Sequence, residues 1–338
     1  MGRESAPAEI AFRDVVKRYP GRERSAVDSL NITVAPGEIC VLIGPSGCGK
    51  TTALKMINRL ISISAGDITI DDKSVKELEL AQLRRGIGYV FQQIGLFPHL
   101  TVEANIGSVP RLLGWSKARI HERAGELLEL VGLDPTTDLK RYPAEFSGGQ
   151  QQRIGVARAM AADPPIMLMD EPFGAIDPIA RERLQNDFLR LHRQVHKTVI
   201  FVTHDIDEAI KMGDRIAIMR DGRLVQMATA DELLAMPVND FVASFVGADR
   251  GLKRLRVRTL DELELGPPPA DGQPTGPTVP IHTSLHNALS KMLADGTTRL
   301  EVTGEDGRVV GTVRLDMITA LVAPRDGTTA PTGETTVA

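Results

Sequence analysis

The chain has 338 residues, 42% of them hydrophobic and 25% charged, and its formal net charge is −4. This composition is typical of a soluble globular protein of two or three domains, and the negative charge gives no general attraction to nucleic acid, so we expect no nucleic-acid partner. The two cysteines, Cys40 and Cys48, are too few and too close in sequence for a disulfide framework, which favours a reducing compartment.

Residues 9–247 are predicted to form one α/β unit, because short apolar runs alternate there with longer helical patterns. Near-continuous apolar runs are typical of strands that are buried on both faces of a mainly parallel sheet. The expected strands are ICVLIG (39–44), GYVFQ (88–92), IMLMD (166–170), TVIFVTH (198–204) and RIAIMR (215–220).

A phosphate-binding loop is predicted at residues 44–51, GPSGCGKT, between an apolar strand and an apolar helical pattern. Its glycines allow the backbone N–H groups to surround a phosphate, Lys50 can reach the β- and γ-phosphates of ATP, and the Thr51 hydroxyl can bind Mg²⁺. A glycine-rich turn that binds nothing is the alternative, which the strand–loop–helix context disfavours. The residues expected to contact ATP here are Gly44, Pro45, Ser46, Gly47, Cys48, Gly49, Lys50, Thr51 and Thr52.

Two later stretches of this unit have helical patterns. Residues 101–160 are predicted to be a helical insert between elements of the sheet. Residues 177–198 are predicted to contain an amphipathic helix with one buried face. The apolar residues on that face recur at intervals of four, three and four, and they are Leu184, Phe188, Leu191 and Val195.

An acidic pair, Asp170 and Glu171, ends the expected strand at 166–170. A carboxylate at Asp170 can hold Mg²⁺ directly or through water, and Glu171 is the natural general base for an attacking water. The alternative is that the pair only caps a helix, since Pro172 marks a turn. The phosphate loop upstream favours the catalytic interpretation.

The composition changes after Gly247. Residues 248–278 are predicted to be a linker, because the segment 266–278 is rich in Pro and Gly and has no periodicity. Residues 279–322 are predicted to be a compact module of one strand, a helix, a hairpin and a short helix. That first helix is expected to bury Leu285, Leu289 and Leu293, and residues 323–338 are expected to be disordered.

The segment FSGGQ, residues 146–150, resembles the LSGGQ signature of ABC transporter ATP-binding subunits. The resemblance covers about residues 10–247, with the motifs in the family's order. It implies a P-loop NTPase (ABC ATPase) core with a helical subdomain, and ATP hydrolysis with Mg²⁺ as cofactor. In that family Ser147, Gly148, Gly149 and Gln150 would face the ATP of a second copy, which implies a homodimer.

Four further residues resemble functional positions of the family. Tyr19 resembles the aromatic residue that stacks on adenine, and Gln92 resembles the loop glutamine that touches Mg²⁺ and the membrane partner. Asp177 resembles the aspartate that crosses between protomers, although the family more often has SALD where this chain has GAID. His204 resembles the switch histidine that contacts the γ-phosphate. For Tyr19 a surface position, and for His204 a structural one, are the alternatives.

Two histidine pairs are spaced for one helix face, His192 with His196 and His282 with His286. A metal site usually needs a third protein ligand, and neither pair has one nearby in sequence. We therefore expect exposed helix faces at these positions rather than metal sites.

The module at 279–322 resembles a CBS module, which implies regulation, either by an adenosine-type ligand or by ionic conditions. An ATPase subunit with such a module resembles those of quaternary amine importers for glycine betaine, choline, carnitine or proline betaine. EPFGAIDPIAR (171–181) and VTHDIDEAI (202–210) are also similar to that subfamily. The resemblance implies integral membrane permease subunits, an extracytoplasmic solute-binding protein and a place on the cytoplasmic face of the plasma membrane.

Two other functions remain open. One is import of a different solute, such as a polyamine, a sugar or an oxyanion, by the same machinery. The other is a non-transport ABC ATPase that acts on DNA or on the ribosome. The chain lacks the long coiled coil of the repair type and the second nucleotide domain of the ribosome type. It also has no apolar run of the roughly 18 residues that a membrane span requires, so transport would need another chain.

Overall fold

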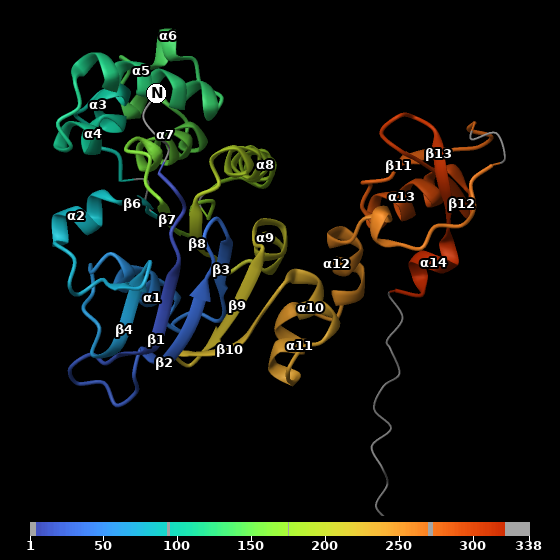
Figure 1. Ribbon diagram of the computed structural model, residues 1–338, viewed down its shortest axis with the longest axis horizontal. Coiled ribbons are helices and arrows are strands. Elements are labelled where there is room, and N and C mark those ends of the chain that lie inside the picture. Colours follow the sequence, from blue (N-terminus) through green and yellow to red (C-terminus); the bar gives the residue numbers. More distant parts are fainter. Residues whose placement is uncertain (1–4, 93–94, 175, 270–272, 322–338) are drawn as a thin grey trace, which may run out of the picture. The chain divides into compact units, whose positions relative to one another are not determined.

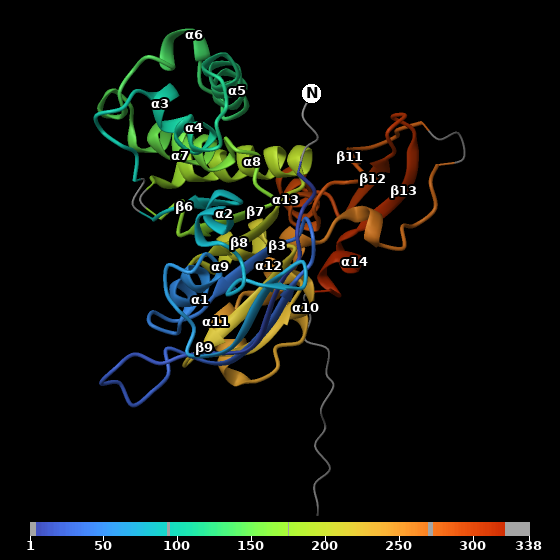
Figure 2. The same cartoon turned by 60° about the vertical axis from the view of Figure 1, so that its left-hand side comes forward.

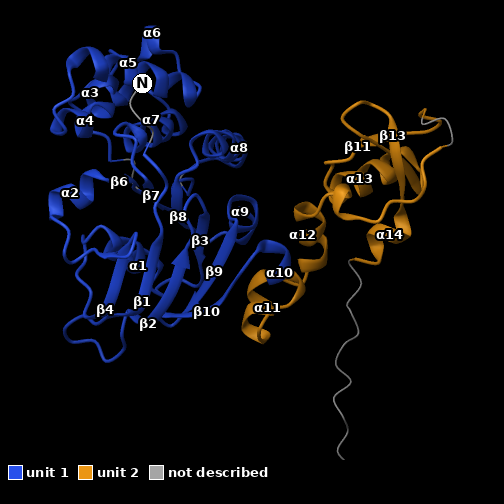
Figure 3. Ribbon diagram, in the orientation of Figure 1, with its two compact units in different colours: residues 1–233 blue, residues 234–338 orange. Residues whose placement is uncertain are grey.

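The computed structural model describes residues 5–92, 95–174, 176–269 and 273–321 (Figure 1). The chain divides into two compact units, Met1–Leu233 and Leu234–Ala338. Figure 3 colours the two units separately, and each is described by itself below.

A six-stranded sheet lies at the centre of the first unit, and its order is β10-β9-β3-β8-β7-β6. All neighbouring strands are parallel except β9 and β10, which form an antiparallel pair at one edge. Every residue of β3, β7 and β8 is buried, as expected for strands that are covered on both faces. The strands are β3 (Ile39–Ile43), β6 (Ile87–Val90), β7 (Ile166–Asp170), β8 (Thr198–Val202), β9 (Arg215–Arg220) and β10 (Arg223–Ala228).

A second, antiparallel sheet has the order β2-β1-β4-β5. One hydrophobic cluster contains side chains from this sheet, from the six-stranded sheet and from helix α1 (Lys50–Ile57), among them Phe12, Leu54 and Leu168. The helix that follows the phosphate loop is therefore anchored in the main core of the unit. The strands are β1 (Ile10–Lys17), β2 (Val27–Val34), β4 (Ala65–Ile70) and β5 (Lys73–Ser74).

Short helices gather at one end of the first unit, as Figures 1 and 2 both show. They occupy the stretch that was expected to be a helical insert. Their core includes Val102, Ala124 and Ile154, which are fully or almost fully buried. The helices are α3 (Val102–Ile106), α4 (Ser108–Leu112), α5 (Lys117–Leu130), α6 (Pro135–Asp138), the 3₁₀ turn η1 (Pro143–Glu145) and α7 (Gly148–Met160).

The described part of this unit also contains the helices α2 (Leu80–Arg85), α8 (Pro178–Val195) and α9 (Ile206–Met212). Helix α8 buries Leu184, Phe188 and Leu191, as its apolar spacing predicts. The same helix also buries His192, whose Nε2 lies 2.7 Å from the Lys197 carbonyl oxygen, so the expectation that this histidine is exposed is wrong.

The second unit contains a three-stranded sheet of order β11-β12-β13, with β11 parallel and β13 antiparallel to β12. Helix α13 buries Leu285, Ala288 and Met292 against this sheet, whereas Leu293, which was expected on the buried face, is 71% exposed. The elements are α11 (Asp240–Val246), α12 (Arg250–Val257), η2 (Leu260–Glu262), β11 (Thr278–Pro280), α13 (Leu285–Asp295), β12 (Arg299–Thr303), β13 (Val309–Arg314) and α14 (Leu315–Thr319), and α10 (Ala230–Ala235) precedes them.

The segment predicted to be a linker is residues 248–278, and most of its described part, 248–269 and 273–278, is folded onto this module. Leu255 and Leu260 belong to its hydrophobic core. Gly266 exchanges two backbone hydrogen bonds of 2.8 and 3.0 Å with Thr312, and the Glu301 carboxylate accepts hydrogen bonds from the segment around Thr275. The described part of the stretch 266–278 is held by backbone and side-chain hydrogen bonds, which leave no apolar periodicity in the sequence. For this reason a linker was expected. The tail expected at 323–338 lies outside the described residues.

None of the described helices is both long and apolar enough to cross a lipid bilayer.

Candidate functional site

The phosphate loop connects β3 to α1, and close packing requires glycine at two of its positions. A Cβ atom on Gly44, whose φ is +152°, would lie 2.1 Å from the Met219 carbonyl oxygen. A Cβ atom on Gly49, whose φ is +106°, would lie 2.4 Å from the Ala26 carbonyl oxygen. Only glycine avoids these clashes with backbone. The middle of the loop, Pro45–Gly47, is exposed, so its backbone is open to a ligand.

A positive charge lies within the loop. Lys50 is buried, and its Nζ donates hydrogen bonds to the Gly44 carbonyl oxygen at 2.7 Å and to the Pro45 carbonyl oxygen at 3.2 Å. Among the described residues, no side chain caps the first turn of α1, which begins at this lysine. The N–H groups of a helix's first turn have no partner within the helix, so this turn and the Lys50 ammonium beside it suit an anion such as a polyphosphate.

Two oxygen atoms that suit a hard cation meet beside the loop. The Thr51 hydroxyl donates a hydrogen bond to Asp170 Oδ1 at 2.9 Å, and Lys55 Nζ lies 3.9 Å from Asp170 Oδ2. Burial raises the pKa of the Asp170 carboxyl above its ordinary value, despite the opposing effects of Thr51 and the two lysines. A buried carboxylate and a hydroxyl are donors that Mg²⁺ accepts in proteins, so the chemistry of the pair fits this ion.

The three residues predicted to be catalytic come together at the carboxyl ends of three neighbouring strands. Glu171 follows β7 with a φ of +46°, and its Oε2 accepts a hydrogen bond of 3.1 Å from Gln92 Nε2 beyond β6. His204, beyond β8, places its Nδ1 3.2 Å from the same oxygen. The carboxyl edge of a parallel sheet is the usual place for a binding site in α/β proteins.

Tyr19 lies just after β1, and its ring is partly exposed. The ammonium of Lys17 is 5.0 Å from the ring centroid and the guanidinium of Arg22 is 5.9 Å from it. The partly exposed ring offers an aromatic face on which a flat ligand can stack. Thr52, in the first turn of α1, is also partly exposed.

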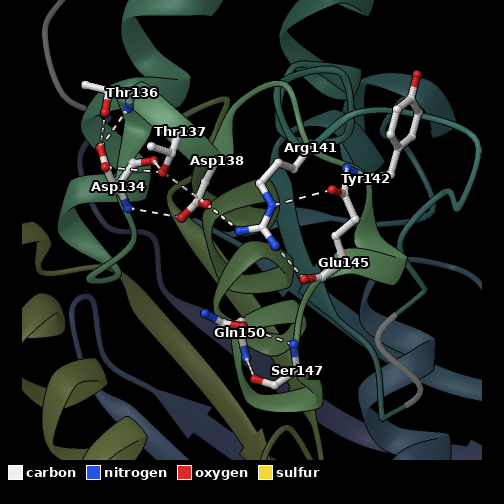
Figure 4. Close-up of polar contacts among 9 residues, drawn as sticks. All are labelled: Asp134, Thr136, Thr137, Asp138, Arg141, Tyr142, Glu145, Ser147 and Gln150. Atoms are coloured by element: carbon white, nitrogen blue, oxygen red, sulfur yellow. Dashed lines mark hydrogen bonds and ion pairs between the residues drawn. The ribbon is translucent and has the colours of Figure 1, made fainter.

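The signature segment forms the start of α7, as Figure 4 shows. Ser147 is the N-cap: its hydroxyl accepts from the Gln150 N–H at 3.4 Å, and the Gln150 side chain accepts from the Ser147 N–H at 3.0 Å. Phe146 is buried beneath the guanidinium of Arg141, which is 4.2 Å from the ring centroid. This packing fixes the exposed Ser147 and Gly148, and the partly exposed Gly149, at the positive end of a helix of 13 residues.

Ser147, Gly149, Gln150 and Asp177 line one open depression with a volume of 570 Å³. No residue of the phosphate loop lines this depression. Figures 1 and 2 place the two motifs in different layers, with α1 among the strands and α7 among the helices. The signature and Asp177 therefore form one surface, and the phosphate loop with Glu171 and His204 forms another.

Three residues near these surfaces were not predicted from the sequence. Lys55 pairs with Asp170, one helical turn after Thr51. Ile179 is 84% exposed at the rim of the depression, beside Asp177. Arg181 contacts the loops of both Asp177 and His204. For Ile179 the sequence offered one signal, an isoleucine in the first turn of a helix. Lys55 and Arg181 gave no such signal, because their roles depend on partners that are distant in the sequence.

Comparisons with known proteins agree with this geometry. Residues 27–174 match the family model described as ABC transporter. The chain is 55% identical over 308 residues to the osmoprotectant import ATP-binding protein OsmV of Salmonella typhimurium, covering 90% of this chain and 79% of that protein. It is 46% identical to the choline transport ATP-binding protein OpuBA of Bacillus subtilis, covering 91% of this chain and 79% of that protein.

Other similar proteins give the same assignment. The chain is 43% identical to the glycine betaine uptake system ATP-binding protein YehX of Escherichia coli, covering 90% of this chain and 97% of that protein. Its fold matches a dimeric structure of the ATP-binding cassette MJ0796 bound to ADP and Pi, with a TM-score of 0.58 and 33% identity, covering 65% of this chain and 98% of that chain. The chain therefore belongs to the ABC transporter family of ATP-binding proteins and is an ATPase.

Proposed function

We propose that this chain hydrolyses ATP to energise the import of a quaternary amine compatible solute, such as glycine betaine, choline, carnitine or proline betaine. The observation that carries the proposal is the identity of 43–55% with three ATP-binding proteins named for osmoprotectant import, choline transport and glycine betaine uptake, over about nine tenths of the chain. Import of a polyamine, a sugar or an oxyanion is the competing assignment.

ATP is held by the phosphate loop in this proposal. The backbone N–H groups of residues 44–52 and the Lys50 ammonium bind the phosphates, and Tyr19 stacks on the adenine. Thr51, Asp170 and Gln92 hold Mg²⁺. When it is bound, Mg²⁺ neutralises charge on the β- and γ-phosphate oxygens. Two observations support this arrangement: the clashes that a side chain would cause at Gly44 and Gly49, and the 2.9 Å contact between Thr51 and Asp170.

Glu171 is the proposed general base. Its carboxylate takes a proton from the attacking water while the water oxygen bonds to the γ-phosphorus and the bond to the bridging oxygen of ADP breaks. Gln92 and His204 both contact Glu171 Oε2, so they orient the carboxylate and leave Oε1 for the water. His204 would also contact the γ-phosphate from this position.

The site is shared between two copies of the chain in this proposal. Ser147, Gly148, Gly149 and Gln150 of one copy face the γ-phosphate of ATP bound by the other, and Asp177 crosses the interface. No phosphate-loop residue of the same chain lines the depression that contains the signature. The capping box uses the N–H groups of Ser147 and Gln150, so the groups proposed to meet the ATP of a second copy are the Ser147 hydroxyl and the N–H groups of Gly148 and Gly149. The similar cassette MJ0796 is described as dimeric in its ADP- and Pi-bound structure.

A membrane permease is the proposed partner at a second surface, which would place the chain on the cytoplasmic face of the plasma membrane. An open groove with a volume of 430 Å³ lies between β6 and the helices, and exposed Phe91 and Phe97 line it with Arg158. Phe91 directly precedes Gln92, so a segment of a partner in this groove would be one residue from a proposed Mg²⁺ ligand. An extracytoplasmic solute-binding protein would deliver the solute to the permease.

The folded module of the second unit is proposed to be a CBS-like regulatory module that takes an adenosine-type ligand. Its support is the β-α-β-β-α order from β11 to α14.

Reconstitution in liposomes tests the transport assignment. The chain is combined with the permease and solute-binding protein that copurify with it, and ATP turnover is measured with saturating glycine betaine, choline, a polyamine, a sugar or an oxyanion. We expect a quaternary amine to raise turnover about fivefold or more over the solute-free rate. Stimulation by one of the other solutes alone would replace the assignment with that solute class.

A further inference from the structure

The loops that carry Asp177 and His204 each begin a helix, and an aspartate caps each helix. The Asp177 carboxylate accepts from the Ala180 N–H at 3.0 Å at the start of α8. At the start of α9, Asp205 Oδ1 accepts from the N–H groups of Asp207 at 2.9 Å and Glu208 at 3.2 Å. Because each cap ties its loop to a helix, a shift of either helix start moves the adjoining loop.

Arg181 joins these two loops. Its Nη2 donates a hydrogen bond of 2.9 Å to the Ile176 carbonyl oxygen, directly before Asp177. Its Nη1 lies 3.8 Å from Asp205 Oδ2, directly after His204. Its Nε is buried and, within the described parts of the chain, has no hydrogen-bond partner. One planar group thus contacts the backbone of one loop and the side chain of the other.

A second contact between the same helices makes this connection stiff. One turn along α8 from Arg181, Gln185 Nε2 donates a hydrogen bond of 3.0 Å to Glu208 Oε1, and both side chains are buried. Arg181, Glu208, His204 and Glu171 also line one small cavity. The arginine therefore lies against the same space as the proposed general base and the switch histidine.

We propose that Arg181 is a positioning residue that couples the Asp177 surface to the general base of its own chain. The proposal rests on the roles given above to Asp177, His204 and Glu171. When a second copy presses on the Asp177 surface, the Ile176 carbonyl shifts, and the guanidinium and Asp205 shift with it. His204 then changes its contact with Glu171 Oε2. Hydrolysis thus responds to docking of the partner through a rigid group that lysine cannot imitate.

A double-mutant cycle on the full-length chain tests this. Arg181→Met removes the guanidinium but keeps the apolar stem, and Asp205→Asn keeps the Oδ1 cap but removes the charge that faces Arg181. We expect each single variant to lower kcat about tenfold or more, with KM for ATP within about twofold. The double variant should match the slower single variant, because both changes break one contact. Arg181→Lys should not restore kcat.

The matched control is Arg190→Ala on the same helix, whose side chain is 75% exposed and pairs with Asp187. It should leave kcat within about twofold of wild type. Multiplicative losses in the double variant, an unchanged kcat in Arg181→Met, or full rescue by Arg181→Lys would each overturn the coupling. Thermal unfolding of every variant detects loss of fold, and a drop in kcat that follows stability across the set also overturns it.

A different result would contradict the proposed function. Glu171→Gln is assayed beside the cycle, and retained turnover in that variant contradicts the role of Glu171 and, with it, the coupling. If Glu171→Gln loses turnover and the losses of kcat in the double variant of Arg181 and Asp205 are multiplicative, only the coupling is contradicted.

Discussion

At the residue scale, two residues of the site, Asp170 and Glu171, are held in positions that are energetically unfavourable. Both are proposed to act in ATP hydrolysis. Asp170 is buried beside a hydroxyl and near two lysines, yet burial still raises the pKa of its carboxyl. Glu171 has a φ of +46°, a left-handed conformation that is unfavourable for a glutamate. Asp170 is the last residue of β7 and Glu171 directly follows it, so the fold is strained where ATP hydrolysis requires charge.

Asp170→Asn is predicted to stabilise the chain when metal and nucleotide are absent. The folded pKa of Asp170 is raised, so the folded state binds more protons than the unfolded state between the two pKa values, and wild-type stability falls as pH rises through that window. The variant should therefore unfold at a higher temperature than wild type at pH 7.5. The difference should shrink as pH falls toward about 4, near the unfolded pKa.

The same variant should lose ATP turnover by about 100-fold, because an amide is a poor ligand for Mg²⁺. Thermal unfolding at several pH values and steady-state turnover check the two halves of this prediction. A variant that is less stable than wild type at pH 7.5, and by the same amount near pH 4, would show that Asp170 is not destabilised by burial.

At the element scale, α7 has to perform two tasks with one residue. Ser147 caps the helix and, in the proposed dimer, presents its hydroxyl to phosphate. Helix α8 similarly begins at Asp177, which caps it and lies on the same depression as Ser147. The two helix starts therefore form one surface, and stability and function can be separated by changing the cap.

Ser147→Ala should lower the free energy of unfolding by about 1 kcal/mol, because it removes the N-cap. Ser147→Asp should restore most of this loss, since aspartate is an equally good cap. Neither variant should recover turnover, because alanine lacks the hydroxyl and the aspartate carboxylate repels phosphate. Urea unfolding and turnover of both variants check this. Wild-type turnover in Ser147→Asp would show that the signature does not meet a phosphate.

At the scale of the whole molecule, the parts that the sequence predicts well are those whose signal is local. The parallel strands β3, β7 and β8 are buried throughout, so their apolar runs stand out in the sequence. The antiparallel sheet was not predicted, because its strands are only partly buried: in β1 the pattern breaks at Arg13 and Asp14, which are exposed. An interrupted apolar run of this kind gives no clear strand pattern.

The residues of the candidate site also differ in whether a local sequence signal reveals them. Lys50 and Asp170 lie in motifs with fixed spacing, so their types and order in the chain were sufficient to identify them. Arg181 could not be identified in this way, because its partners are a backbone carbonyl in the preceding loop and a carboxylate beyond another strand. The contact between Thr275 and Glu301 in the second unit is similar, since no local pattern reveals it.

Association of the chain with itself tests the shared site most directly. Sedimentation velocity is run on Glu171→Gln with and without Mg²⁺-ATP, and on the double variant Glu171→Gln/Ser147→Arg as a control that retains its own phosphate loop. We expect a monomer without ATP, a dimer of Glu171→Gln with ATP, and a monomer of the double variant even with ATP bound. A Glu171→Gln chain that binds ATP but stays monomeric, or a dimer that persists with Ser147→Arg, would contradict a site shared between two copies.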